Sequence, residues 1–181
     1  MLQVMMISGK SASGKDTFAN LLKERYENIG KKVLIIHFGD LVKYFATTYY
    51  NWDGDKIQPS GRALLQYIGT ELMRTNFPTY WAEVVGKFIS VVENYDIAII
   101  SDWRFKNELE TVALYNENIA TIRINRFDNE GKPYYNSNMR LNQLTHISEC
   151  ELDNFNFEWI IENRSLEDLK ASADYIVEGV F

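Results

Sequence analysis

The sequence contains a single cysteine, Cys150, which excludes an internal disulfide bond. It has no apolar run long enough to cross a bilayer, and its start lacks a basic flank followed by a signal-type apolar core. Positive charge is scarce, because 19 Lys and Arg residues face 25 Asp and Glu residues and leave a net charge of −6. We therefore expect neither a nucleic acid nor a membrane as partner, and the reducing cytoplasm as location.

Enough apolar sequence is present for one sizeable core. The chain has 181 residues, of which 46% are hydrophobic, and this predicts a single domain spanning 1–181. Apolar segments alternate with segments of helical period, which predicts an α/β fold with a five-stranded, mainly parallel sheet and helices on both faces. The expected strands are 2–7, 33–38, 97–100, 120–124 and 159–161. The expected helices are 15–28, 40–50, 60–75, 79–93, 106–115 and 165–177, whereas the polar segment 127–145 shows neither period.

A glycine-rich loop follows the first expected strand and runs into the first expected helix. Gly9 and Gly14 are separated by four residues, and Lys15 comes directly afterwards. Such a loop curls so that consecutive backbone N–H groups point inward, and the lysine adds a full charge for the β- and γ-phosphate oxygens of a nucleotide. The alternative is an ordinary Gly-Ser loop with an exposed lysine. The flanking strand and helix favour a phosphate-binding P-loop.

Candidate metal contacts come from two places in the sequence. Asp16 stands where a Ser or Thr usually reaches Mg²⁺, so Thr17 is expected to supply the hydroxyl, with water and a carboxylate completing the site. Asp102 and Arg104 follow the third expected strand, whose carboxyl end meets the ligand crevice in a doubly wound sheet. There the carboxylate could orient the Mg²⁺ water shell and the guanidinium could hold a phosphate. The alternative is that Asp102 caps the next helix and that Arg104 pairs with Glu108.

A third cluster lies on the helix expected at 60–75. Arg62 and Gln66 are four residues apart and share one helix face, and Gly69 and Thr70 follow one turn later. This face could present a cation to a phosphate, an amide to a base edge and a small residue where a ring approaches. The alternative is a solvated helix with an apolar core stripe, together with Trp81 as a core aromatic.

Taken together, these motifs resemble the phage-type deoxynucleoside monophosphate kinases, a branch of the adenylate-kinase-like P-loop fold. The matching stretches are SGKDT at 13–17, RALLQYIGTEL at 62–72 with YW at 80–81, the D-x-R-x-x-x-E pattern at 102–108, and THISE at 145–149. They occur in the family's order and span nearly the whole chain. The resemblance implies a three-layer P-loop kinase fold and transfer of the γ-phosphoryl group of ATP to a deoxynucleoside monophosphate, with Mg²⁺. It also implies a cytoplasmic location, in the host if the chain is phage-encoded.

The resemblance divides the expected site residues into two sides. The ATP side comprises Gly9, Lys10, Ser13, Gly14, Lys15, Asp16, Thr17 and Arg126. The monophosphate side comprises Arg62, Gln66, Gly69, Thr70, Trp81, Asp102, Arg104 and Glu108. The expected catalytic residues are Lys15, Arg62, Asp102 and Arg104, and the expected metal contacts, made through water, are Thr17 and Asp102.

More specific roles follow from the same resemblance. Arg62 and Arg104 would hold the acceptor phosphate, Trp81 would pack against the base or sugar, and Glu108 would contact the nucleotide or orient Arg104. The monophosphate-binding region would be about 40–95, and an exposed helix face in it could support a homodimer. Segment 127–145 would be the lid.

Three arginines are candidates to reach ATP from the lid side, namely Arg123, Arg126 and Arg140. The alternative for each is a solvated charge.

Two other functions stay open. The phosphomevalonate kinases of animals carry a similar loop and arginine motif, so another small phosphorylated acceptor would also fit. A nucleotide-binding regulatory protein without transfer activity would also carry a P-loop. Such a protein has no need of a second arginine-bearing phosphate site, and this favours the kinase.

Overall fold

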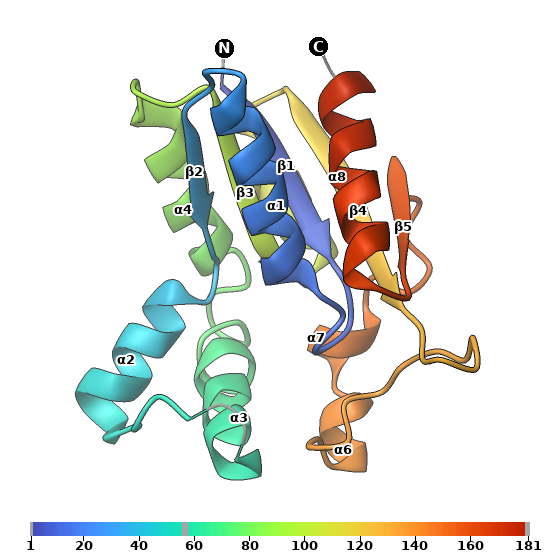
Figure 1. Ribbon diagram of the computed structural model, residues 1–181. Helices are drawn as coiled ribbons and strands as arrows, with labels where there is room; N and C mark the ends of the chain where they lie inside the picture. The colour runs from blue at the N-terminus through green and yellow to red at the C-terminus, as the bar shows by residue number, and fades with distance from the viewer. Residues whose placement is uncertain (1, 56–57, 180–181) are drawn as a thin grey trace.

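The computed structural model describes residues 2–55 and 58–179, and its centre is a five-stranded sheet in which every pairing of neighbours is parallel. The strand order is β2-β3-β1-β4-β5. The strands are β1 (Gln3–Ser8), β2 (Val33–Ile36), β3 (Ile97–Trp103), β4 (Ile119–Arg126) and β5 (Trp159–Asn163). The predicted α/β class with a parallel sheet is therefore confirmed, and all strands send their carboxyl ends to one edge (Figure 1).

Helices cover both faces of the sheet because the central strand is apolar on both sides. Val4 and Met6 of β1 belong to one core cluster, whereas Met5 and Ile7 belong to the other, as the period of two in a strand requires. Helices α1 (Lys15–Asn28) and α8 (Leu166–Gly179) pack on the second cluster and lie together on one face. Helices α4 (Tyr80–Val91) and α5 (Lys106–Ala113) pack on the first. The result is the expected three-layer arrangement.

The remaining helices lie beyond the carboxyl ends of the strands, in two groups. Helices α2 (Asp40–Tyr50) and α3 (Pro59–Gln66) lie on the side of β2, and α6 (Leu141–Leu144) and α7 (Ile147–Cys150) lie on the side of β5 (Figure 1). Segment 127–145 is mainly irregular, as expected, with a bridge between Phe127 and Pro133 and the short α6 near its end. The four-residue α7 was not predicted.

The helix predicted at 60–75 is wrong in one respect. The chain leaves α3 in a π-helical segment, η1 (Tyr67–Leu72). Gly69 lies inside it, and the Gly69 carbonyl accepts a hydrogen bond of 3.0 Å from the Trp81 indole. Glycine has a low helix propensity, and the Trp81 indole can replace a backbone N–H as the donor to the Gly69 carbonyl. A residue outside η1 therefore stabilises the wider π-helical turn.

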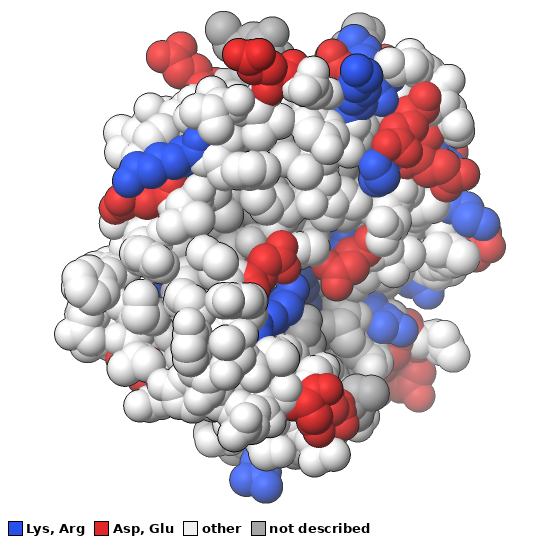
Figure 2. All heavy atoms as spheres, turned by 90° about the vertical axis from the view of Figure 1, so that its left-hand side faces the viewer, with Lys and Arg blue, Asp and Glu red and all other residues white. Residues whose placement is uncertain are grey.

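Exposed aromatic side chains gather on α2 and η1. Tyr44, Tyr49 and Tyr50 of α2 and Tyr67 of η1 are exposed. The lower part of this face carries few charged side chains (Figure 2). Within 2–55 and 58–179, no helix is long and apolar enough to cross a membrane.

Candidate functional site

The loop between β1 and α1 has the backbone of a phosphate cradle. Ala12 has a φ of 60° and Gly14 a φ of 100°, so the chain reverses twice through the left-handed region before α1 begins. Gly14 is required there twice over, because a Cβ would also lie 2.6 Å from Asn163 Nδ2. That Asn163 amide donates to the Ser13 carbonyl at 2.8 Å and ties the loop to the end of β5. The strand, loop and helix therefore follow one another as the motif predicts.

Lys15 points back across the loop. Its Nζ donates to the carbonyl of Gly9 at 2.9 Å and to that of Lys10 at 2.8 Å, and its side chain is buried. The Lys15 pKa is lowered to about 7, chiefly by burial and next by the nearby positive charge of Arg104. An anion bound in the cradle would oppose both effects. A phosphate bound in the loop would therefore stabilise the charged form of Lys15.

The donor-side hollow is open to solvent beside this lysine. It is lined by Ala12, Ser13, Gly14, Lys15, Asp16, Thr17 and Arg126. Arg126 donates to the Ala12 carbonyl at 2.9 Å and stacks over the Tyr134 ring with its guanidinium carbon 4.2 Å from the ring centroid. Of the expected ATP-side residues, Gly9 and Lys10 are not part of this lining. The Lys10 Nζ instead pairs with Asp153 at 2.5 Å and donates to the Glu149 carbonyl at 2.7 Å.

The three lid-side arginines differ in position. Among the described residues, Arg126 is the one of the three whose side chain donates a hydrogen bond to the P-loop. Arg123 is buried and donates to Ser8 Oγ at 3.1 Å and to Asp153 at 2.8 Å, which makes it a core ion pair rather than the solvated charge of the alternative. Arg140 begins α6, where its backbone N–H donates to the Gln143 side chain at 3.0 Å.

On the other side of Lys15, a cavity extends between β3, η1 and α4. Every residue expected on the monophosphate side lines it: Arg62, Gln66, Gly69, Thr70, Trp81, Asp102, Arg104 and Glu108. Trp81 presents little surface, since it is 1% exposed and its indole is bonded to Gly69. Its ring forms one wall of the cavity and part of the core at once, so the functional and the core interpretations both describe it.

Two carboxylates near the end of β3 shape the backbone around this cavity. Asp102 accepts the N–H of Phe38 at 2.8 Å and of Gly39 at 2.9 Å, and so fixes the turn that leads into α2. Glu108 accepts the N–H of Arg104 at 2.8 Å and of Phe105 at 3.0 Å, and so caps α5 from inside. The suggestion that Asp102 caps this helix is thus wrong, because Glu108 does so.

Arg74 is a cavity residue that the sequence did not single out. It pairs with Glu108, and its guanidinium carbon lies 4.0 Å from the centroid of the Phe105 ring. Glu108 is 1% exposed, and burial raises its pKa to about 7 although Arg74 opposes the shift. The alternative pairing of Arg104 with Glu108 is therefore not formed: the Arg104 guanidinium faces the P-loop, and Arg74 takes the carboxylate.

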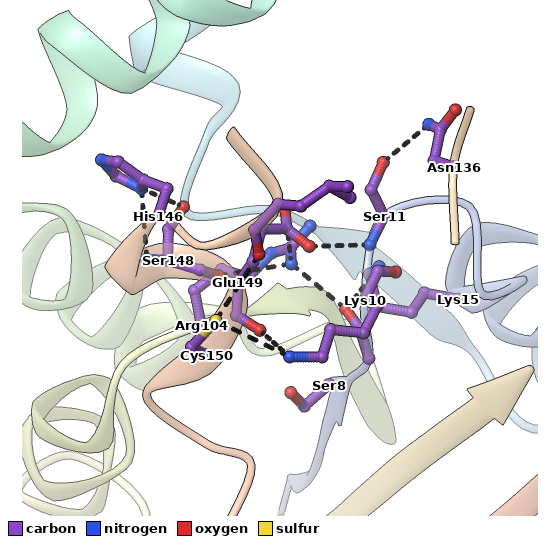
Figure 3. Close-up of polar contacts among 12 residues, drawn as sticks. Ser8, Lys10, Ser11, Lys15, Arg104, Asn136, His146, Ser148, Glu149 and Cys150 are labelled. Carbon is purple, nitrogen blue, oxygen red and sulfur yellow. Dashed lines mark hydrogen bonds and ion pairs between the residues drawn. The ribbon is translucent and has the colours of Figure 1, made fainter. Parts of the chain in front are cut away.

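Glu149 is the functional candidate that sequence reasoning missed. Its Oε2 accepts the Ser11 N–H at 2.8 Å, and its Oε1 lies 3.1 Å from Arg104 Nη1 (Figure 3). The same Oε1 lies 3.9 Å from Arg62 Nη1. Arg104 Nη1 also lies 3.2 Å from the Gly9 carbonyl, which Lys15 shares. The THISE stretch belonged to the resemblance, but no position in it was given a role. Only the fold brings this segment to the loop.

The oxygen atoms of Thr17, Asp16 and Asp102 suit a Mg²⁺ ion that takes most of its ligands from water and phosphate. Within the described ranges, no group of three or more His, Cys, Asp and Glu side chains is placed to hold a metal ion. Thr17 is exposed in the donor-side hollow, and Asp16 accepts a hydrogen bond from Ser101 Oγ at 2.9 Å. Asp102 is already committed to two backbone N–H groups. A Mg²⁺ ion needs only one or two protein oxygens beside a nucleotide, and these residues can supply them.

Comparison with solved structures shows the fold of the P-loop kinases. The gluconokinase from Sinorhizobium meliloti 1021 matches with a TM-score of 0.54 and 10% identity over 98% of this chain and 95% of that chain. The shikimate kinase from Aquifex aeolicus matches with 0.53 and 15% over 98% of each. The APS kinase from Mycobacterium tuberculosis, in complex with AMPPNP and APS, matches with 0.52 and 9% over 97% and 95%. No protein-family model and no curated protein sequence matches the chain. The likeness to phage-type enzymes therefore stays a prediction.

Proposed function

We propose that the protein transfers the γ-phosphoryl group of ATP to the phosphate of a deoxynucleoside monophosphate. One observation carries this proposal: Lys15, which lines the hollow at the P-loop, and Arg104, which lines the neighbouring cavity, contact the same carbonyl, that of Gly9. The P-loop would hold the donor phosphates, and the cavity beyond Arg104 would hold the acceptor. A phosphate on each side would bring the reacting groups together in line.

Each residue would have a limited task, since phosphoryl transfer needs alignment and charge neutralisation rather than a protein nucleophile. Lys15 would contact the β- and γ-phosphates, and Arg126 would cover the nucleotide from the side of segment 127–145, the proposed lid. Arg62 and Arg104 would hold the acceptor phosphate. Its oxygen would attack the γ-phosphorus, the bond to the β–γ bridging oxygen would break, and ADP and a diphosphate would leave.

Mg²⁺, bound near Thr17 and reached by Asp102 through water, would neutralise charge on the transferring group. Asp102 would also act by holding the turn at Gly39, which forms part of the acceptor wall. The proposed monophosphate-binding region, about 40–95, supplies Arg62, Gln66 and Trp81 to the cavity. Within this region, α2 and α3 would move as the site closes and excludes water.

The nature of the cavity supports a nucleotide as acceptor. Trp81, Phe38 and Val42 supply apolar walls, while Gln66 has a buried side-chain nitrogen that has no hydrogen-bond partner among the described residues. A buried amide donor gains from an acceptor atom on a ligand, such as one on the edge of a base. Arginine at one end and an aromatic, amide-bearing pocket at the other suit a molecule with a phosphate and a heterocycle.

The test is ADP formation from ATP with each common deoxynucleoside and ribonucleoside monophosphate in turn. At least one monophosphate should stimulate turnover strongly, and Arg104→Ala should reduce that turnover by about 10³-fold because it removes charge at the transferring group. Arg25→Ala is the matched control, since this arginine pairs with Asp174 on α8, away from the cavity. A panel in which no monophosphate stimulates ADP formation would reject the proposal.

A further inference from the structure

Glu149 lies at the meeting point of the two proposed phosphate sites. Its side chain is 4% exposed, and it is an ion-pair partner of both Arg62 and Arg104. The other acidic groups nearby are engaged elsewhere: Asp102 with backbone N–H groups, Glu108 with Arg74, and Asp153 with Lys10. The carboxylate of Glu149 therefore occupies the position where a phosphate would meet the arginines.

The two arginines are held loosely by this carboxylate. Arg62 Nη1 stands 3.9 Å from Glu149 Oε1, beyond hydrogen-bond distance, and the Arg62 side chain donates no hydrogen bond to another described residue. Arg104 Nη1 is closer, at 3.1 Å, and divides its contacts among Glu149 and the carbonyls of Gly9 and Ser148. A guanidinium group in a partly buried site is stabilised when all its N–H donors form hydrogen bonds. Arg62 and Arg104 both have N–H donors that Glu149 does not use.

The backbone of Glu149, in contrast, is fixed. Lys10 Nζ donates to its carbonyl at 2.7 Å, and the start of α7 is tied to η1 because His146 Nε2 lies 3.2 Å from Glu71 Oε1 (Figure 3 shows His146 and Glu149 on the same segment). A rotation of the Glu149 side chain, which also breaks its hydrogen bond from the Ser11 N–H, would thus release the arginines. Helix α7 could keep its contacts to the P-loop while this happens.

We propose that Glu149 is an internal counter-ion, which neutralises Arg62 and Arg104 while the acceptor site is empty and yields them to the incoming phosphate. This inference rests on the proposed function for the identity of the acceptor, but not for the competition between anions. A single carboxylate charge is displaced best by a dianion. The device therefore selects phosphomonoesters, which are close to dianionic at neutral pH, over singly charged carboxylates.

The experiment measures the affinity of inorganic phosphate by calorimetry for the parent, Glu149→Gln and Glu149→Ala. Removal of the competing charge should tighten phosphate binding by about tenfold in both variants, because a unit charge near 4 Å is worth about fivefold in water and more in a partly buried site. Glu117→Gln is the control, with the same charge change on the exposed turn before β4, at the opposite edge of the sheet, and should leave the affinity unchanged. Thermal melting of each variant establishes that it is folded.

A triple variant separates the acceptor site from the P-loop. In a protein that carries Arg62→Gln and Arg104→Gln, adding Glu149→Gln should bring no gain in phosphate affinity, since both released arginines are gone. Unchanged or weaker binding in Glu149→Gln and Glu149→Ala would overturn the counter-ion role and make Glu149 a structural brace. A gain that persists without both arginines would also overturn it. The binding of inorganic phosphate is measured without turnover. These results therefore do not depend on whether any monophosphate stimulates ADP formation.

Discussion

Lys15 makes ATP affinity depend on pH in a way that can be calculated. In the free protein its pKa is lowered to about 7, chiefly by burial and next by Arg104, so above neutral pH most molecules carry an uncharged lysine. Bound phosphates favour the charged form and raise the pKa again. ATP binding above pH 7 must therefore take up a proton, and the affinity must fall as the pH rises.

The size of the effect follows from the protonated fraction. With a pKa of about 7, roughly a quarter of the free protein is protonated at pH 7.5 and about 1% at pH 9. The dissociation constant for ATP should thus rise by about twentyfold over this range, with uptake of about one proton at pH 8.5. The nucleotide itself contributes little, because its terminal phosphate is already ionised there.

Calorimetry in buffers with different ionisation enthalpies gives both the affinity and the number of protons. Lys15→Arg is the matched variant, since an arginine stays charged and should show a flat affinity between pH 7.5 and 9 even if binding is weaker overall. A parent protein whose ATP affinity is independent of pH over this range, with no proton uptake, would refute the reasoning. It would mean that Lys15 stays charged in the free loop.

Three further predictions concern the frame of the site. Gly14→Ala should destabilise the fold by about 1–3 kcal/mol in a denaturant titration, because its φ is 100° and the added Cβ would meet Asn163; a change within error would contradict this. Glu108→Ala should cost about 3–5 kcal/mol, since it leaves Arg74 without its carboxylate, and equal stability would show that Arg74 finds another partner. Trp81→Phe should cost about 1 kcal/mol and disturb η1 through the lost bond to Gly69, which hydrogen exchange of η1 would report.

Much of the fold was predictable because its signals are local. The central strands are continuous apolar runs, and Gly9, Gly14 and Lys15 identify the P-loop within seven residues. The carboxyl-edge rule for parallel sheets then placed Arg104 beside the loop, and the structure does bring them together. These features need only the period of the sequence and one topological rule.

The missed features depend on partners far along the chain. The π-helical turn at Gly69 needs the indole of Trp81, which donates from another helix. Glu149 is separated from Ser11 by 138 positions, and nothing around it forms a recognisable period. The pairing of Glu108 with Arg74 likewise displaced the local pairing with Arg104 that spacing suggested. Tertiary contacts decide such cases, and a single sequence does not contain them in readable form.

The most direct test of two facing phosphate sites is the affinity of a bisubstrate analogue, in which adenosine and a deoxynucleoside are joined by a chain of phosphates. It should bind far more tightly than ATP or the monophosphate alone, and Lys15→Met and Arg104→Ala should each lose most of that gain. A bisubstrate analogue that binds no better than ATP, or whose gain survives Arg104→Ala, would contradict the account.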